Sequence, residues 1–89
     1  MPRNDIGWVR TGANGEKLEL YAHQIGTRWH FYCRAGRGGD WSELTDPPLE
    51  DWLECLDGVR RRTSRRQYGP EQAGLLEAFI RKRFPRAEF

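Results

Sequence analysis

The spacing of the apolar residues changes halfway along the chain, and that change limits the folds that the chain can adopt. Through residues 17–34, apolar and polar residues alternate, which is typical of β-strands with one buried face. From residue 47 onward the apolar residues recur every three or four positions, as they do in amphipathic helices. The sequence therefore predicts an α+β fold, in which a small antiparallel β-meander of three or four strands is followed by two C-terminal α-helices packed on one face of the sheet.

Two neighbouring strands of this meander are expected to form a hairpin. A two-residue connection at Ile25 and Gly26 would join them, with the glycine supplying the positive φ that such turns need. The apolar residues of both strands would then lie on the same face of the sheet. The predicted pairs are Leu18 with Cys33, Leu20 with Phe31, and Ala22 with Trp29.

Glycine, proline and aspartate mark where the expected elements begin and end. Asn14 with Gly15, and the glycine-rich residues 35–40, predict turns between strands. Asp46 can cap the first helix with Pro47 in its first turn, and Pro85 would end the second helix. We expect strands at about 6–10, 17–24, 27–35 and 41–44, and helices at about 47–62 and 70–84.

Length and composition predict one small domain spanning residues 1–89. A chain this short buries only about two thirds of its unfolded surface, so it has room for one core and a second domain is excluded. The chain lacks an apolar run of about twenty residues and starts with polar residues, so we expect no membrane segment and a cytoplasmic location. Cys33 and Cys55 are expected to be buried free thiols, as in a reducing compartment.

Residue types used in catalysis and metal binding are present, but their spacing does not suit either role. His23, His30, Cys33 and Cys55 lack the short spacing of zinc ligands, and His30 and Cys33 project from opposite faces of one strand. The glycine-rich residues 36–39 lack the lysine of a phosphate-binding loop. We therefore expect no enzyme activity, no metal and no cofactor, with His23 and His30 as polar surface residues beside Tyr21.

Charges are sorted along the chain although the net charge is only +2. Residues 40–57 contain acids and no base, whereas residues 58–69 contain arginines and no acid. The acids of the first helix, Glu50, Asp51, Glu54 and Asp57, are expected on its solvated face. The arginines form the first candidate binding surface, which consists of Arg60, Arg61, Arg62, Arg65 and Arg66.

This charge pattern predicts a binding or regulatory module that contacts a protein partner, or a second copy of itself, through separate acidic and basic surfaces. If the charges instead act within the chain, Arg81 and Arg83 of the second helix pair with Glu50 or Glu54 of the first. The alternative function is nucleic-acid binding, because arginines can contact phosphates and exposed rings can stack on bases. The residues suited to this on the sheet form a second candidate surface of Tyr21, His30, Tyr32, Trp41, Arg28, Arg34 and Arg37.

Overall fold

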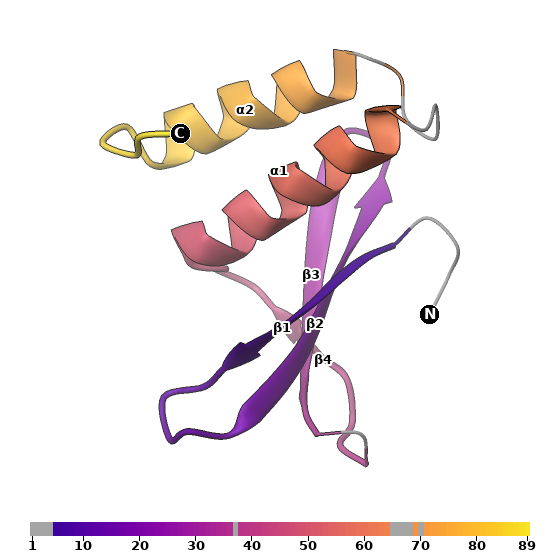
Figure 1. The fold of residues 1–89 in the computed structure, drawn as a ribbon, viewed down its shortest axis with the longest axis vertical. Helices are drawn as coiled ribbons and strands as arrows, with labels where there is room; N and C mark the ends of the chain where they lie inside the picture. Colours follow the sequence, from indigo (N-terminus) through magenta and orange to yellow (C-terminus); the bar gives the residue numbers. More distant parts are fainter. Residues whose placement is uncertain (1–4, 37, 65–68, 70) are drawn as a thin grey trace. The chain divides into compact units, whose positions relative to one another are not determined.

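A computed structural model describes residues 5–36, 38–64, 69 and 71–89 of the chain. Four antiparallel strands form one sheet and two helices follow them, so the predicted α+β fold is confirmed (Figure 1). The contacts divide the chain into two compact units, Met1–Asp46 with the sheet and Pro47–Phe89 with the helices. The expectation that these units form a single domain, with the helices on one face of the sheet, stays a prediction.

The sheet is a simple meander in which each strand pairs with the next one along the chain. The strand bounds lie within one or two residues of the predicted ones, and β4 starts just after Trp41 instead of at it. The turn between β1 and β2 is formed where the Asn-Gly pair predicted it, with a positive φ of 81° at Gly15. The strands are β1 (Ile6–Thr11), β2 (Lys17–Ile25), β3 (Arg28–Ala35) and β4 (Ser42–Leu44).

The predicted register of the β2–β3 hairpin is wrong by two residues. Ile25 pairs with Arg28, so the two turn residues are Gly26 and Thr27, and Gly26 has a φ of 63°. The predicted turn would have placed Ile25 at the first turn position, where a β-branched side chain disfavours a positive φ. A shift of two residues keeps every side chain on its predicted face, because the side-chain period of a strand is two.

Buried residues of the first unit lie on one face of the sheet. Ile6, Leu20, Ala22 and Phe31 are each at most 1% exposed, and alternation predicted the last three on the apolar face. Trp8 lies in the same set of alternate positions, with its ring edge-on to Phe31 at a centroid distance of 5.7 Å. The opposite face carries the polar and aromatic residues described below.

The second unit consists of helix α1 (Leu49–Ser64) and helix α2 (Glu71–Arg83), which pack against each other. Helix α1 starts two residues later than predicted, because the Pro48 carbonyl accepts the first hydrogen bonds of the helix. Pro47 precedes another proline and is therefore kept out of the helical conformation. The capping position is thus Pro48, and Asp46 lies two residues before it. Pro70, where α2 was expected to start, lies outside the described residues.

Helix α1 buries one of the acids that were expected on its solvated face. Glu50, Glu54 and Asp57 are exposed as predicted, but Asp51 is 0% exposed. The prediction for Asp51 is wrong because the buried side of α1 extends to the stripe that contains Cys55 and Gly58, four and seven residues further on. These residues are small and therefore gave a weak apolar signal.

Helix α2 buries only part of its apolar set. Leu76 and Ile80 are buried, whereas Leu75 and Phe79 are 59% and 51% exposed. Leu75 and Phe79 therefore belong to the apolar residues of this helix but not to its buried side.

Candidate binding surface

A cluster of aromatic rings lies on the polar face of the sheet, at the middle of β2 and β3. Tyr21 and Tyr32 are directly opposite each other and stack with a centroid distance of 4.9 Å and an interplanar angle of 22°. Trp41, just before β4, presents its ring edge-on to Tyr21 at 4.8 Å and 78°. In the other neighbouring strand, β1, Gly7 is the residue that pairs with Tyr21, and it adds no side chain to this face. The three rings therefore form one continuous group, with Tyr21 on β2, Tyr32 on β3 and Trp41 just before β4.

Arg34 is the cationic residue next to these rings, and a salt bridge holds it in place. Arg34 and Glu19 are opposite each other in the β2–β3 register, and Nε and Nη2 of Arg34 lie 2.8 and 2.7 Å from Oε2 of Glu19. The guanidinium carbon of Arg34 also lies 4.6 Å from the centroid of the Trp41 ring. A guanidinium at this distance from an indole is attracted to the ring quadrupole. We call Tyr21, Tyr32, Trp41, Arg34 and Glu19 the aromatic sheet face.

Two histidines lie beside this cluster in the next pair of opposite positions. His23 pairs with His30 across β2 and β3, and each ring has a carboxylate partner. Nδ1 of His23 lies 2.6 Å from Oδ1 of Asp5, and Nδ1 of His30 lies 3.4 Å from Oε2 of Glu43. The sequence predicts polar surface histidines but not their contact with Asp5, because a single acid just before a strand gives no local signal of a partner on the next strand.

Burial raises the pKa of the Tyr21 phenol above its ordinary value, and the Asp5 carboxylate and Tyr32 raise it further. The phenol is therefore neutral at physiological pH and offers a hydroxyl to a ligand, not a charge. The register also keeps His30 and Cys33 on opposite faces of β3, as predicted. Within the described ranges, no group of three or more His, Cys, Asp or Glu residues is placed to hold a metal ion.

The two cysteines are free thiols in different environments. Cys55 is fully buried in α1, and burial raises the pKa of its thiol strongly despite the opposing effect of Arg62. Cys33 is only half-buried, so the expectation of two buried thiols holds for Cys55 alone. A buried thiol with a raised pKa is a poor nucleophile.

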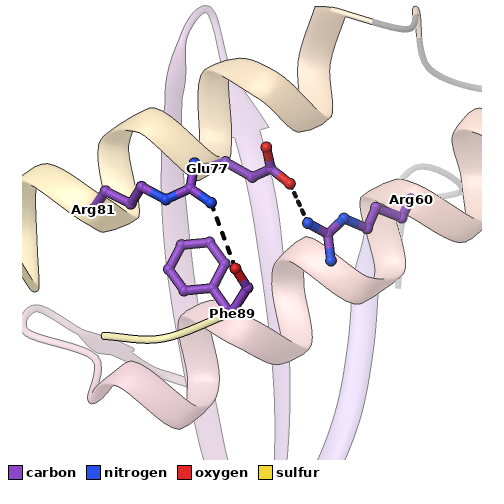
Figure 2. Close-up of polar contacts among 4 residues, drawn as sticks. All are labelled: Arg60, Glu77, Arg81 and Phe89. Atoms are coloured by element: carbon purple, nitrogen blue, oxygen red, sulfur yellow. Dashed lines mark hydrogen bonds and ion pairs between the residues drawn. The ribbon is translucent and has the colours of Figure 1, made fainter. Parts of the chain in front are cut away.

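Two arginines of the first candidate surface have carboxylate partners in the structure, and the surface itself stays a prediction. Arg60 forms an ion pair with Glu77 of α2 (Figure 2), and Nη2 of Arg61 lies 3.3 Å from Oδ2 of Asp57 on its own helix. Arg62 is half-buried. The last two members, Arg65 and Arg66, lie outside the described residues.

The predicted pairing of Arg81 with Glu50 or Glu54 is also replaced by other contacts. Arg81 donates to the Phe89 carbonyl at 3.5 Å and lies over the Phe89 ring, as Figure 2 shows. Arg83 lies over the ring of Phe84 at 4.7 Å. An ion pair between the two helices joins Arg60 of α1 to Glu77 of α2.

Part of the second candidate surface lies together in the structure. Of its members, Tyr21, Tyr32, Trp41 and Arg34 form the aromatic sheet face, and His30 lies beside them. Arg28 is exposed at the start of β3, and Arg37 lies outside the described residues.

Comparison with known proteins gives no family assignment. No family model, no curated protein and no solved structure matches this chain. A function must therefore be argued from the residues described above. Among them, no helix is long and apolar enough to cross a membrane.

Proposed function

We propose that this chain is a non-enzymatic protein-binding module that uses the aromatic sheet face as its docking surface. The observation that carries the proposal is the setting of Trp41, which is 37% exposed with its ring edge-on to Tyr21 and close to the Arg34 guanidinium. Trp, Tyr and Arg are the residue types most enriched at the energetic centres of protein interfaces.

The contacts within this cluster favour tight association because they reduce the cost of ordering it. Arg34 is restrained by Glu19 and by Trp41, and the two tyrosine rings restrain each other. An arginine that is free in solution loses rotamer entropy when a partner immobilises it, whereas a restrained one loses less. The face is thus ready to bind a partner without large rearrangement.

The charge balance favours a protein over a nucleic acid. Glu19 neutralises Arg34, and Glu43 lies opposite Tyr32 and near His30. Phosphate binding draws its affinity from cations that replace condensed counterions, and a cation already paired with a carboxylate contributes little to it. The same argument applies to Arg60 and Arg61, because both have carboxylate partners.

The proposal is tested by replacing Trp41 with alanine. Partners captured from cell extract by the wild type should be identified, and their affinity for purified wild type and Trp41→Ala should be compared. We expect Trp41→Ala to weaken binding by about thirtyfold, the size of an interface hot spot of about 2 kcal/mol. Ile25→Ala removes another exposed apolar side chain from the same face and should leave binding nearly unchanged.

Two results would contradict the proposal. One is a partner that binds wild type and Trp41→Ala equally well. The other is salt-dependent binding of labelled single-stranded oligonucleotides that Trp41→Ala abolishes, which would favour the nucleic-acid alternative. Mass measurement in solution, over a range of concentrations, tests the self-association that the charge pattern also predicted.

A further inference from the structure

Helix α2 exposes a stripe of side chains that is apolar at its start and basic at its end. Leu75, Ala78, Phe79 and Lys82 are all exposed and follow the spacing i, i+3, i+4 and i+7, which places them along one side of the helix. We call these four residues the α2 stripe. Leu75 and Phe79 are among the most exposed large apolar side chains of the described chain.

The apolar part of the α2 stripe packs against a buried tryptophan of α1. The Phe79 ring lies 4.9 Å from the ring of Trp52 in α1, at an angle of 44°, and Trp52 itself is only 7% exposed. Trp52 therefore restrains one side of the Phe79 ring, while about half of the Phe79 surface stays exposed to water. A rigid aromatic side chain with an open face suits contact with a partner because little entropy is lost on binding.

The charges near the stripe are strongly one-sided at its C-terminal end. Arg81, Lys82 and Arg83 form the last turn of α2, and all three are exposed. Arg86, just beyond the helix, is exposed as well. A partner that covers Leu75 and Phe79 and continues in this direction would meet positive charge, so acidic residues on it would be attracted and basic ones repelled.

We propose that the α2 stripe binds an amphipathic helical segment of another protein whose apolar side chains cover Leu75 and Phe79 and whose acidic residues lie over Lys82 and Arg86. The segment would present apolar residues at the same i, i+3, i+4 and i+7 spacing, so that the ridges of the two helices interlock. This surface belongs to the helical unit and does not depend on the aromatic sheet face.

A lipid surface fits the α2 stripe less well. Helices that lie in a membrane interface bury an apolar face along much of their length, and the apolar part of the stripe is confined to Leu75, Ala78 and Phe79. Glu71, at the start of α2, is exposed and would face the repulsion of anionic headgroups. The surface is thus better matched to a short protein segment.

The test uses the full chain and three labelled synthetic helical peptides. The first carries leucines at i, i+3, i+4 and i+7 with glutamates at the flanking positions, the second has lysine in place of every glutamate, and the third has serine in place of every leucine. Fluorescence anisotropy at about 0.05 and 0.3 M salt gives their affinities, with salt reporting the charge contribution. We expect binding of the acidic peptide only, weaker at the higher salt concentration.

Variants of the chain then assign the binding to the stripe. Leu75→Ser, at a position that is 59% exposed, should fold normally and weaken binding about tenfold, as expected for losing one leucine contact. Lys82→Glu combined with Arg86→Glu should abolish binding of the acidic peptide and create binding of the lysine peptide. Lys17→Glu, a charge reversal in the sheet unit, should change neither affinity.

Four outcomes would overturn the proposal. They are no binding of the acidic peptide at low salt, no effect of Leu75→Ser, no exchange of peptide preference in the charge-reversed variant, and tighter binding to anionic vesicles than to the peptide. A dimer that forms in solution and is lost in Leu75→Ser would also overturn it, because the stripe would then contact a second copy. Peptide binding to the α2 stripe does not depend on Trp41, so the proposal for the aromatic sheet face and the proposal for the α2 stripe can be contradicted independently.

Discussion

Nδ1 of His23 lies 2.6 Å from Oδ1 of Asp5, and the Asp5 side chain is fully buried whereas the His23 ring is 39% exposed. A carboxylate removed from water is costly unless it is hydrogen-bonded. The imidazole N–H is well placed to donate to it, and a hydrogen bond to an ionised acceptor is among the stronger polar contacts in proteins. The pair therefore anchors the residue just before β1 to the neighbouring strand β2.

The first prediction concerns this pair. His23→Ala removes a donor to a buried carboxylate and should lower the free energy of unfolding by about 2 kcal/mol, measured by chemical denaturation. His30→Ala is the matched control, since its contact with Glu43 is longer and half-exposed, and it should cost less than about 1 kcal/mol. Equal losses in both variants would show that the burial of Asp5 does not determine the strength of the contact.

Faces could be predicted from the sequence, but the residues that meet across the strands could not. Alternation placed Leu20, Ala22 and Phe31 correctly on the buried face, because a period of two needs no knowledge of the turn. The pairs depend on the turn, and the predicted register would have placed Glu19 opposite Tyr32. The true register places Glu19 opposite Arg34. The neutralisation of Arg34, which favours a protein partner over a nucleic acid, could therefore not be foreseen.

The helical half shows a second limit of sequence patterns. Leu56 and Val59 are buried in α1, as helical spacing favours, but Asp51 is buried too although it was expected in water. An acid is normally assigned to water, and its burial here depends on neighbours in space whose identity local spacing does not reveal. Exposure of Leu75 and Phe79 is the converse case, in which apolar residues that fit a helical pattern remain in water.

Thiol reactivity should differ sharply between the two cysteines. Burial raises the pKa of the Cys55 thiol, so little thiolate is present at neutral pH and reagent access is blocked. Cys33 is half-buried and should react first with a disulfide reagent. In the native state Cys33→Ser should therefore lose nearly all fast labelling, and denaturant should restore reaction of the one remaining thiol. Rapid labelling of Cys55 in the folded variant would contradict its burial.

Tyr21 should make the stability of the chain depend on alkaline pH. Burial is the main cause that raises the pKa of its phenol above the ordinary value of 10.0. Because the folded state holds this proton more tightly than the unfolded state, the contribution of Tyr21 is complete below pH 10 and is lost as pH rises through the folded-state pKa. Wild type should lose stability relative to Tyr21→Phe as the pH rises above about 10. Parallel pH curves for the two proteins would exclude this linkage.

The ion pair between Arg60 and Glu77 should couple the two helices only weakly. The side chains are 50% and 26% exposed, and exposed pairs contribute at most about 1 kcal/mol. A double-mutant cycle with Arg60→Ala and Glu77→Ala should give a coupling energy of about 0.5 kcal/mol that falls at high salt. The Arg61–Asp57 pair, which is more exposed, is the control and should give a smaller value. A coupling energy that does not change with salt concentration would mean that packing between the two residues, and not charge, produces it.

Gly26 is the residue on which the hairpin register depends, because a φ of 63° at the first turn position is costly for residues with a Cβ. Gly26→Ala meets no steric obstacle within 4 Å, so its cost of about 1 kcal/mol should come from backbone conformation alone. Gly74, in helix α2, is also open within 4 Å and does not have a positive φ, so Gly74→Ala should not lower stability. Gly26→Asn should fall between the two, since asparagine tolerates the left-handed region. If Gly26→Ala is as harmless as Gly74→Ala, the turn cannot require a left-handed residue at this position. Ile25 would then be tolerated at the first turn position, and the turn would not explain why Glu19 lies opposite Arg34.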